Sequence, residues 1–263
     1  MTSVIKLRLA AATIFSCTIS LPSAAVPAGL AQSTSDGNSN AVPKYLELAR
    51  ELVATVTPEN NKYEFKGPQG VRWKGDLFTS ENSVKTACGG LVAAVFERAK
   101  DPTIDAIKTH IGTRYRTSAV PMKDWYEASN KGWGLKKIPS LGDVRPGDLF
   151  IFSCLDKCET SQGDAKGHIA IVDIKPYKIA PRKPLVGGAD QWVVTVIDSA
   201  DSAHDQNDTR HVPKGDKKIT GVGRGTYRVY SDADGSPVGY TSGLGAKYHD
   251  IAMRPIVISR PSY

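Results

Sequence analysis

Apolar residues recur at helical spacing through the first half of the chain. The first such segment is 43–56, and a second lies at about 84–99. Two shorter segments, 103–110 and 122–130, have the same spacing. The pattern predicts four helices, with an irregular, turn-rich stretch at 57–80 between the first two.

The second half of the chain changes to the alternating period of β-strands. A Pro-Gly turn at 145–147 precedes the first strand, and the Asp-Ala-Asp-Gly peptide at 232–235 is a hairpin turn signal. Helices followed by antiparallel strands predict an α+β fold, with N-terminal helices packed on a central antiparallel sheet. The predicted strands are 148–152, 168–174, 191–198, 226–231, 237–241 and 251–258.

Residues 1–25 have the features of a secretory signal peptide. Lys6 and Arg8 precede an uncharged apolar stretch at 9–21, which is too short to span a bilayer, and small residues follow it. We therefore expect a secreted or periplasmic protein, with no stable membrane insertion once this segment is removed.

The expected cleavage site is after Ala25, with Ala31 as the alternative. Lipidation at Cys17 is a less favoured interpretation, because the apolar stretch continues past it. Residues 26–42 are mostly small and uncharged, which predicts a flexible leader. One domain is expected to follow, over residues 43–263.

The net charge of the whole chain is +7, and loss of Lys6 and Arg8 lowers it to about +5. The basic residues are scattered, without an arginine-rich stripe that alternates with aromatic residues. Nucleic acid is therefore not an expected partner. A mildly basic exported protein is suited to an anionic envelope or polymer.

The cysteines contain one candidate nucleophile. Removal of Cys17 leaves three, and an oxidising compartment favours a disulfide between Cys154 and Cys158, four residues apart in a polar loop. Cys88 is then the unpaired thiol. Zinc ligation by Cys154, Cys158 and His168 is the alternative, but no fourth ligand has suitable spacing. The sequence therefore predicts neither a metal nor a cofactor.

Cys88 lies where a helix is expected to begin. Unpaired backbone N–H groups and the helix dipole at that position favour a thiolate. Gly89 and Gly90 each lower helix propensity by about 1 kcal/mol, which is reasonable if substrate approaches the backbone there. We therefore expect Gly89 to contact substrate. The alternative is that Cys88 is a buried structural thiol.

The predicted strands 168–174 and 192–198 have equal lengths. If they pair as antiparallel neighbours, His168 lies directly opposite Asp198, where a carboxylate would orient the imidazole. His168 would then accept the thiol proton. The arrangement depends on the strand register. The alternatives are a structural histidine at a strand edge, and either Ser199 as the orienting residue or a turn-capping role for Asp198.

Three other polar residues receive structural interpretations. Asp148 is expected to be the turn residue that opens a strand, with a catalytic acid as the alternative. His204 and Asp208 are expected in a solvated polar loop just past Asp198, with a place in the wall of the cleft as the alternative.

Three ordered blocks resemble the NlpC/P60 superfamily, papain-like cysteine peptidases and amidases that cut bacterial cell-wall peptides. Residues 86–92 (TACGGLV) are similar to its nucleophile block, and residues 144–150 (VRPGDLF) to its Pro-Gly-Asp-Leu strand. Residues 167–172 (GHIAIV) are similar to its histidine strand. Segments 208–210 and 221–226 resemble a mostly uncharacterised secreted branch of the superfamily.

The resemblance implies roles for further residues. Asp198 and Ser199 stand where the superfamily places its third polar residue, and Tyr63 is placed like a tyrosine that often contacts substrate. The nucleophile block departs from the usual pattern at Ala87, which replaces an aspartate, and at Gly89, which replaces a serine.

Together these features predict a cysteine hydrolase with a papain-like α+β fold that cleaves an amide bond in peptidoglycan stem peptides. Two alternatives stay open: a catalytically inactive envelope-binding module, and a cysteine acyl or amide transferase. The expected catalytic residues are Cys88, His168 and Asp198, and the expected substrate-binding residues are Tyr63, Gly89 and Ser199.

Overall fold

The computed structural model describes residues 41–67, 69–112, 120–154, 167–244 and 247–262. The predicted signal peptide, with Ala25, Ala31 and Cys17, lies outside the described residues, as does Cys158. Within the described ranges, no helix is both long enough and apolar enough to cross a membrane.

The four predicted helices are present. The second helix begins at Cys88 rather than near Val84, because Ser83–Lys85 forms a strand and Ala87 keeps an extended backbone (φ −79°, ψ 175°). Two short 3₁₀ helices occupy Pro58–Asn60 and Leu141–Asp143. The α-helices are α1 (Lys44–Thr55), α2 (Cys88–Ala99), α3 (Thr103–Ile111) and α4 (Met122–Lys131).

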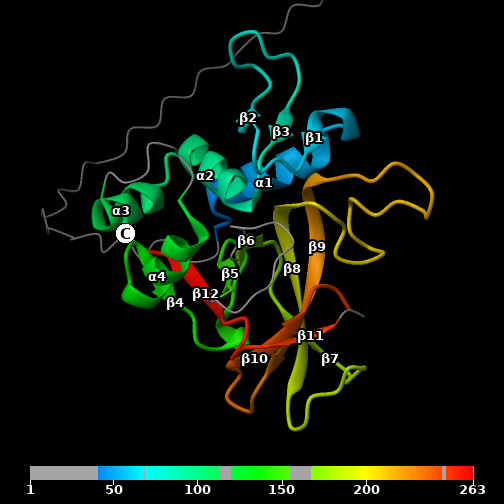
Figure 1. The fold of residues 1–263 in the computed structure, drawn as a ribbon. Coiled ribbons are helices and arrows are strands. Elements are labelled where there is room, and N and C mark those ends of the chain that lie inside the picture. The colour runs from blue at the N-terminus through cyan, green and yellow to red at the C-terminus, as the bar shows by residue number, and fades with distance from the viewer. Residues whose placement is uncertain (1–40, 68, 113–119, 155–166, 245–246, 263) are drawn as a thin grey trace, which may run out of the picture. The chain divides into compact units, whose positions relative to one another are not determined.

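The strands form two sheets, so the predicted α+β class is confirmed (Figure 1). A small sheet has the order β1-β3-β2, with β1 (Asn61–Lys62), β2 (Gly70–Arg72) and β3 (Ser83–Lys85). The large sheet has the order β11-β10-β9-β8-β6-β5-β12-β4, with β7 also paired to β8. Its pairings are antiparallel. Its strands are β4 (Leu135–Lys137), β5 (Leu149–Ser153), β6 (Gly167–Val172), β7 (Tyr177–Ile179), β8 (Asp190–Ala200), β9 (Gly221–Ser231), β10 (Pro237–Thr241), β11 (Tyr248–Asp250) and β12 (Ile256–Pro261).

Strands β1 and β2 lie in the stretch 57–80, which was expected to be irregular, because they pair with the distant strand β3. Two boundaries of the predicted strands also differ, each by five residues. The last strand was expected from 251, but residues 251–254 form a turn before β12. β9 begins at Gly221, five residues before the predicted start at 226. The sequence prediction missed this part of the strand because its glycines weaken the strand pattern.

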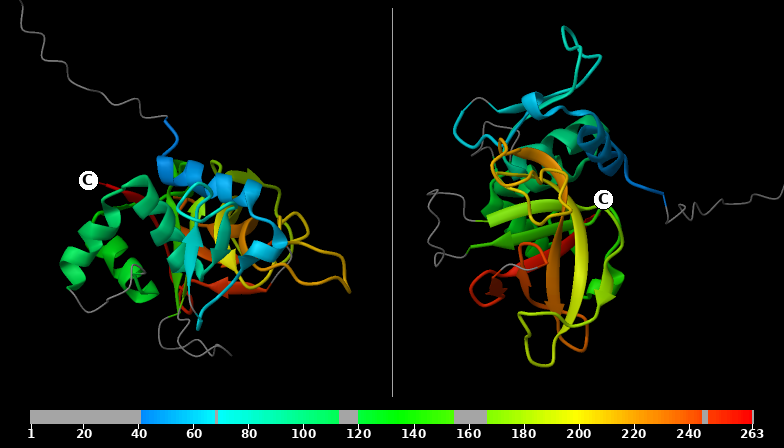
Figure 2. Two further views of the ribbon diagram at one scale, coloured as in Figure 1. Left: turned by 90° about the horizontal axis from the view of Figure 1, so that it is seen from above. Right: turned by 90° about the vertical axis from the view of Figure 1, so that its right-hand side faces the viewer.

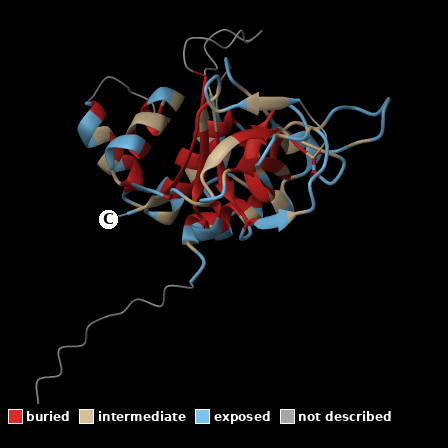
Figure 3. Cartoon of the chain, turned by 90° about the horizontal axis from the view of Figure 1, so that it is seen from below, coloured by how far each residue is buried: buried red, intermediate tan, exposed pale blue. Residues whose placement is uncertain are grey.

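Side chains alternate across the large sheet, and both faces are buried. On β6 and β8, one face carries isoleucines that pack in a core shared with α1 and α2. The opposite face packs in a second core with aromatic residues of β5, β9 and β10. Figure 3 shows these buried residues in red at the centre of the folded domain.

The large sheet is curved. Phe150 of β5 and Tyr227 of β9 lie 5.1 Å apart between ring centroids, although β6 and β8 separate their strands. In a flat sheet those two strands would be roughly 14 Å apart. The long strands β8 and β9, yellow and orange in Figure 2, run side by side through this curve.

The turn before β5 is closed by Asp148, as expected. Its Oδ2 accepts a hydrogen bond from the Arg145 backbone N–H at 2.8 Å. Arg260 of β12 donates to both carboxylate oxygens, at 2.7 and 2.8 Å. This pairing fixes β5 beside β12, and it leaves Asp148 a structural residue.

Candidate active site

Cys88 is the first residue of α2, and α2 lies beside β6 and β8 (Figure 1). The preceding residue, Ala87, makes no side-chain cap, so a helix N-terminus without a capping side chain is next to the thiol. The Cys88 side chain is buried, with Met122 Sδ 4.0 Å from its sulfur. Among the described residues, Cys88 is the free cysteine.

Ser199 fixes the segment that leads into α2. Its hydroxyl donates to the Thr86 carbonyl oxygen at 2.6 Å, and its side chain is fully buried. Substrate contact at Ser199 stays a prediction. The hydrogen bond connects strand β8 to the residue two positions before Cys88.

His168 and Asp198 meet on one face of the sheet. His168 Nε2 lies 2.6 Å from Asp198 Oδ2, and the carboxylate has no exposed surface. Because a carboxylate only accepts, Nε2 carries the hydrogen of this bond. The Nδ1 atom of His168 is then left for Cys88, and the imidazole lowers the pKa of that thiol through its charge and through hydrogen bonding.

The predicted register of these strands is wrong by two residues. β6 and β8 pair Ile171 with Ile197 and Val172 with Val196, which places Asp198 opposite Ala170 rather than opposite His168. A shift of two residues keeps a side chain on the same face. The imidazole therefore reaches the carboxylate along the diagonal of the ladder.

Asp198 has two further partners that the sequence analysis did not assign. His204 Nε2 lies 2.7 Å from Asp198 Oδ2, the oxygen that also receives the His168 bond. Arg210 Nη1 lies 2.8 Å from the other oxygen, Oδ1. The carboxylate is thus held by two histidines and a guanidinium.

The loop that follows β8 is not solvated around these residues, contrary to the prediction for His204 and Asp208. Asp208 and Arg210 are only 4% and 2% exposed. The guanidinium of Arg210 donates to both Asp208 oxygens, at 2.9 and 2.7 Å. Asp208 Oδ2 also accepts the backbone N–H of His204 at 2.9 Å.

Two glycines on β9, Gly223 and Gly225, make room for this loop, and a third, Gly221, makes room for β1. Gly221, Gly223 and Gly225 alternate along the strand and share one face. A Cβ on Gly223 would lie 2.5 Å from Arg210 Nε, and a Cβ on Gly225 would lie 2.5 Å from His204 Cδ2. The alternating glycines are the sequence signal that could have indicated a packed loop.

The charges at the site favour a thiolate–imidazolium pair. Burial raises the pKa of the Cys88 thiol, but the charge and hydrogen bond of His168 and a hydrogen bond with the Ile169 backbone outweigh it and lower that pKa. Burial lowers the pKa of His168, yet the Cys88 thiolate and the hydrogen bond to Asp198 raise it above its ordinary value.

Asp198 is held in its ionised form. Burial raises the pKa of this carboxyl, but the charges of Arg210 and His204 and the hydrogen bonds from both histidines hold it well below the ordinary value. Burial lowers the pKa of Arg210, and its two carboxylate partners raise it. A fixed negative charge therefore stands behind His168.

Of the predicted substrate-binding residues, Tyr63 lies near the site and Gly89 is buried. Burial and then the negative charges of Cys88, Asp201 and Asp198 raise the pKa of Tyr63. A Cβ on Gly89 would meet the Val120 carbonyl oxygen at 3.4 Å, so protein occupies that side of the helix. Substrate contact at either residue stays a prediction.

Of the two cysteines of the predicted disulfide, the structure describes Cys154. Cys154, the residue after β5, takes part in a disulfide bond. Its expected partner, Cys158, lies outside the described residues. The pairing itself therefore stays a prediction.

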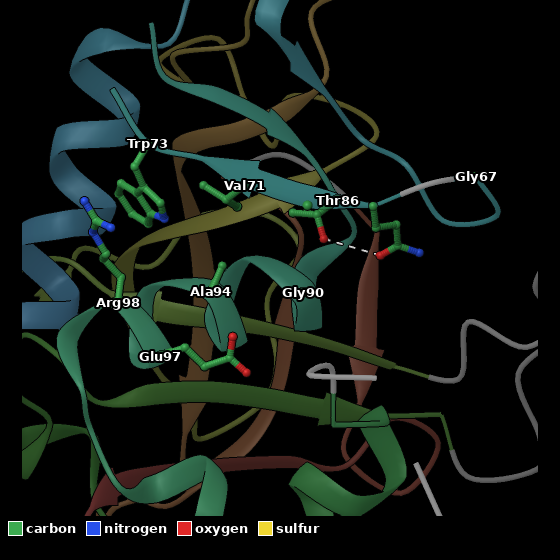
Figure 4. Close-up of a pocket in the computed structure, with 10 residues that line it drawn as sticks. Gly67, Val71, Trp73, Thr86, Gly90, Ala94, Glu97 and Arg98 are labelled. Carbon is green, nitrogen blue, oxygen red and sulfur yellow. Dashed lines mark hydrogen bonds between the residues drawn. The ribbon is translucent and has the colours of Figure 1, made fainter. Parts of the chain in front are cut away.

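A cavity of about 620 Å³ lies between β2 and the outer side of α2 (Figure 4). Trp73, Arg98 and Glu97 line one part of it, and Thr86 and Gly90 line another. Successive helical residues turn by about 100°, so Gly90 faces away from Cys88. This cavity is therefore behind the nucleophile and not in front of it.

His168, Asp198 and His204 also form a cluster of metal-ligating type, with one ligand atom of each within 4.8 Å of the others. The surroundings oppose a cation. Both Nε2 atoms already face the same Asp198 oxygen, and the buried Arg210 guanidinium lies against the other oxygen. The donor set fits a hydrogen-bonded carboxylate better than a metal.

Comparison with known proteins adds one relative. An uncharacterized protein of Acanthamoeba polyphaga mimivirus is 28% identical over 227 residues, covering 83% of this chain and 96% of the viral protein. No protein-family model and no solved structure matches the chain. The similarity therefore covers most of both chains and assigns no activity.

Proposed function

We propose that this protein is a cysteine hydrolase that cleaves an amide bond. The single observation that carries the proposal is the Cys88–His168–Asp198 arrangement at the start of α2. The 2.6 Å bond from His168 to Asp198 and the opposite pKa shifts of Cys88 and His168 support it. An inert buried thiol would have a raised pKa.

The reaction would follow from these roles. The Cys88 thiol gives its proton to His168 Nδ1, and the thiolate attacks the amide carbonyl carbon. Backbone N–H groups at the start of α2 stabilise the oxyanion. The imidazolium protonates the leaving nitrogen as the C–N bond breaks, which leaves a thioester on Cys88. Water, deprotonated by His168, then attacks the thioester and releases the acid and the thiolate.

The proposed substrate class is peptidoglycan stem peptides. Support comes from the resemblance of the three sequence blocks to the NlpC/P60 superfamily and from the predicted export of the chain. The net charge stays positive, at about +5, once Lys6 and Arg8 are removed from the +7 of the whole chain. The same resemblance supports the papain-like form of the α+β fold as part of this proposal.

Alkylation of Cys88 tests the reactive thiol without any substrate. We expect iodoacetamide to label the native protein at pH 6, well below the ordinary thiol pKa of about 8.5. Replacing His168 with Gln removes the imidazolium, so labelling should slow at least tenfold at that pH. His110→Gln, at an exposed histidine on α3, is the matched control and should change nothing. Equal rates in all three proteins would refute an activated thiol.

Turnover tests the substrate class. Soluble stem-peptide fragments should be cleaved by the native protein, and Cys88→Ala should abolish cleavage while thermal unfolding stays within a few degrees of native. Cleavage by Cys88→Ala at the native rate would contradict the mechanism. Fast labelling of Cys88 without cleavage of any fragment would contradict the substrate class alone.

A further inference from the structure

His204 lies at the site although it has no part in the proton transfers. It follows β8 by four residues, and its side chain is only 8% exposed. Its Nε2 lies 2.7 Å from Asp198 Oδ2. Its backbone N–H donates to Asp208 at 2.9 Å, so the main chain and the side chain are both fixed.

The surroundings of His204 are built to hold it. Both carboxylate oxygens of Asp208 accept hydrogen bonds from Arg210. Arg210 Nη1 also donates to the Gly221 carbonyl oxygen at 3.0 Å. The Tyr227 ring covers His204, with centroids 4.6 Å apart. A buried polar side chain whose partners are all fixed keeps a single orientation.

We propose that His204 is a positioning residue that orients Asp198 toward His168. Asp198 Oδ2 receives two N–H donors, while Arg210 holds Oδ1. Three contacts fix the plane of the carboxylate, whereas His168 and Arg210 alone would leave it free to rotate about the line between them. This inference rests on the proposed hydrolase function.

Loss of His204 also changes the charge balance at Asp198. The carboxylate loses a hydrogen-bond donor, so its pKa rises, and it protonates at a higher pH. Once Asp198 is protonated, the imidazolium of His168 has no counter-charge. The thiolate of Cys88 is then lost at the acid end of the pH range. The titratable and charged groups that face Asp198 are His168 from β6, Cys88 from α2, Tyr63 from the segment after β1, Tyr227 from β9, and His204 and Arg210 from the loop after β8.

The test compares three variants with the native protein. His204→Ala removes the donor, and His204→Gln restores an N–H donor of similar reach. His211→Ala is the matched control, because His211 is an exposed histidine in the same loop. We measure kcat and KM for stem-peptide cleavage, and the pH dependence of iodoacetamide labelling at Cys88.

For His204→Ala we expect kcat to fall about 10- to 100-fold with KM within about threefold of native, as for a misplaced catalytic group. The acid limb of the labelling profile should move to higher pH. His204→Gln should recover part of both changes, and His211→Ala should match the native protein.

Two results would overturn the proposal. One is a His204→Ala protein with native kcat and an unmoved acid limb. The other is a loss of rate that equals the loss of folded protein, with no movement of the limb, since that identifies a purely structural residue. If the native protein cleaves no substrate, the hydrolase proposal fails, but the labelling profile still tests whether His204 positions Asp198.

Discussion

Cys88 differs from an ordinary buried cysteine in what faces it. A buried thiol surrounded by apolar groups has a raised pKa. Here the imidazole of His168 stands on one side, and the uncapped N-terminus of α2 adds its positive end. Burial raises the pKa of the thiol, but the charge and hydrogen bond of His168 and a hydrogen bond with the Ile169 backbone together outweigh it and lower that pKa.

Asp198→Asn tests the residue that stands behind the imidazole. An amide presents one acceptor and one donor, so it cannot serve Arg210 on one side and two histidines on the other. We expect cleavage to fall by about 10²- to 10⁴-fold, the range of a lost general base. Initial rates at pH 7 give the measurement. Asp190→Asn is the control, because Asp190 is an exposed carboxylate on the same strand and is paired with Lys178 at 2.6 Å; a matching loss in both variants would argue against the assigned role.

At the scale of elements, the site depends on where one helix and two strands begin or end. α2 begins at Cys88, β6 begins at Gly167, and β8 runs to Ala200. Consecutive residues of β8 point to opposite faces, so Asp198 orients the histidine while Ser199 fixes Thr86. One strand therefore positions both the base and the segment of the nucleophile.

The glycines of β9 allow the loop after β8 to lie against the sheet, and Gly225→Ala tests this. The new methyl group would collide with Asp208 and His204. We expect about 1–3 kcal/mol of lost stability, from overpacking, and at least a tenfold loss of turnover. Gly187→Ala is the control, since nothing lies within 4 Å of its added Cβ. Urea unfolding and cleavage rates check both variants, and native behaviour of Gly225→Ala would show that the loop does not need this space.

At the scale of the whole domain, the buried charges make stability depend on pH. The folded-state pKa of Asp198 lies well below its ordinary value. The ionised carboxylate therefore stabilises the fold above its unfolded pKa of about 4, and that contribution is lost as the pH falls through the folded pKa.

We therefore expect the free energy of unfolding to decrease steeply below about pH 4, the unfolded-state value for an aspartate. Asp198→Asn should be less stable than native at pH 7 and should lose less further stability on acidification. Urea unfolding at pH 7 and at pH 3 measures the difference. Parallel losses in the two proteins would show that Asp198 is not the acid-sensitive group.

The sequence by itself predicted the four helices, most of the long strands and the candidate residues of the site. Helical spacing predicted α1 to α4, and alternation predicted most of the long strands, because local periodicity follows which side is buried. The residues Cys88 and His168 were recognisable because a thiol at a helix start and a histidine at a strand start are unusual in combination. Asp198 followed from equal strand lengths, even though the assumed register was two residues out.

Only the tertiary structure decided what surrounds Asp198. Register is set by pairing between distant segments, so the diagonal contact from His168 could not be deduced from strand lengths. The segment with His204 and Arg210 is polar, and polar composition predicts solvent exposure. Its burial depends on the glycine face of β9, about fifteen residues away in sequence, where charged side chains can pair without water.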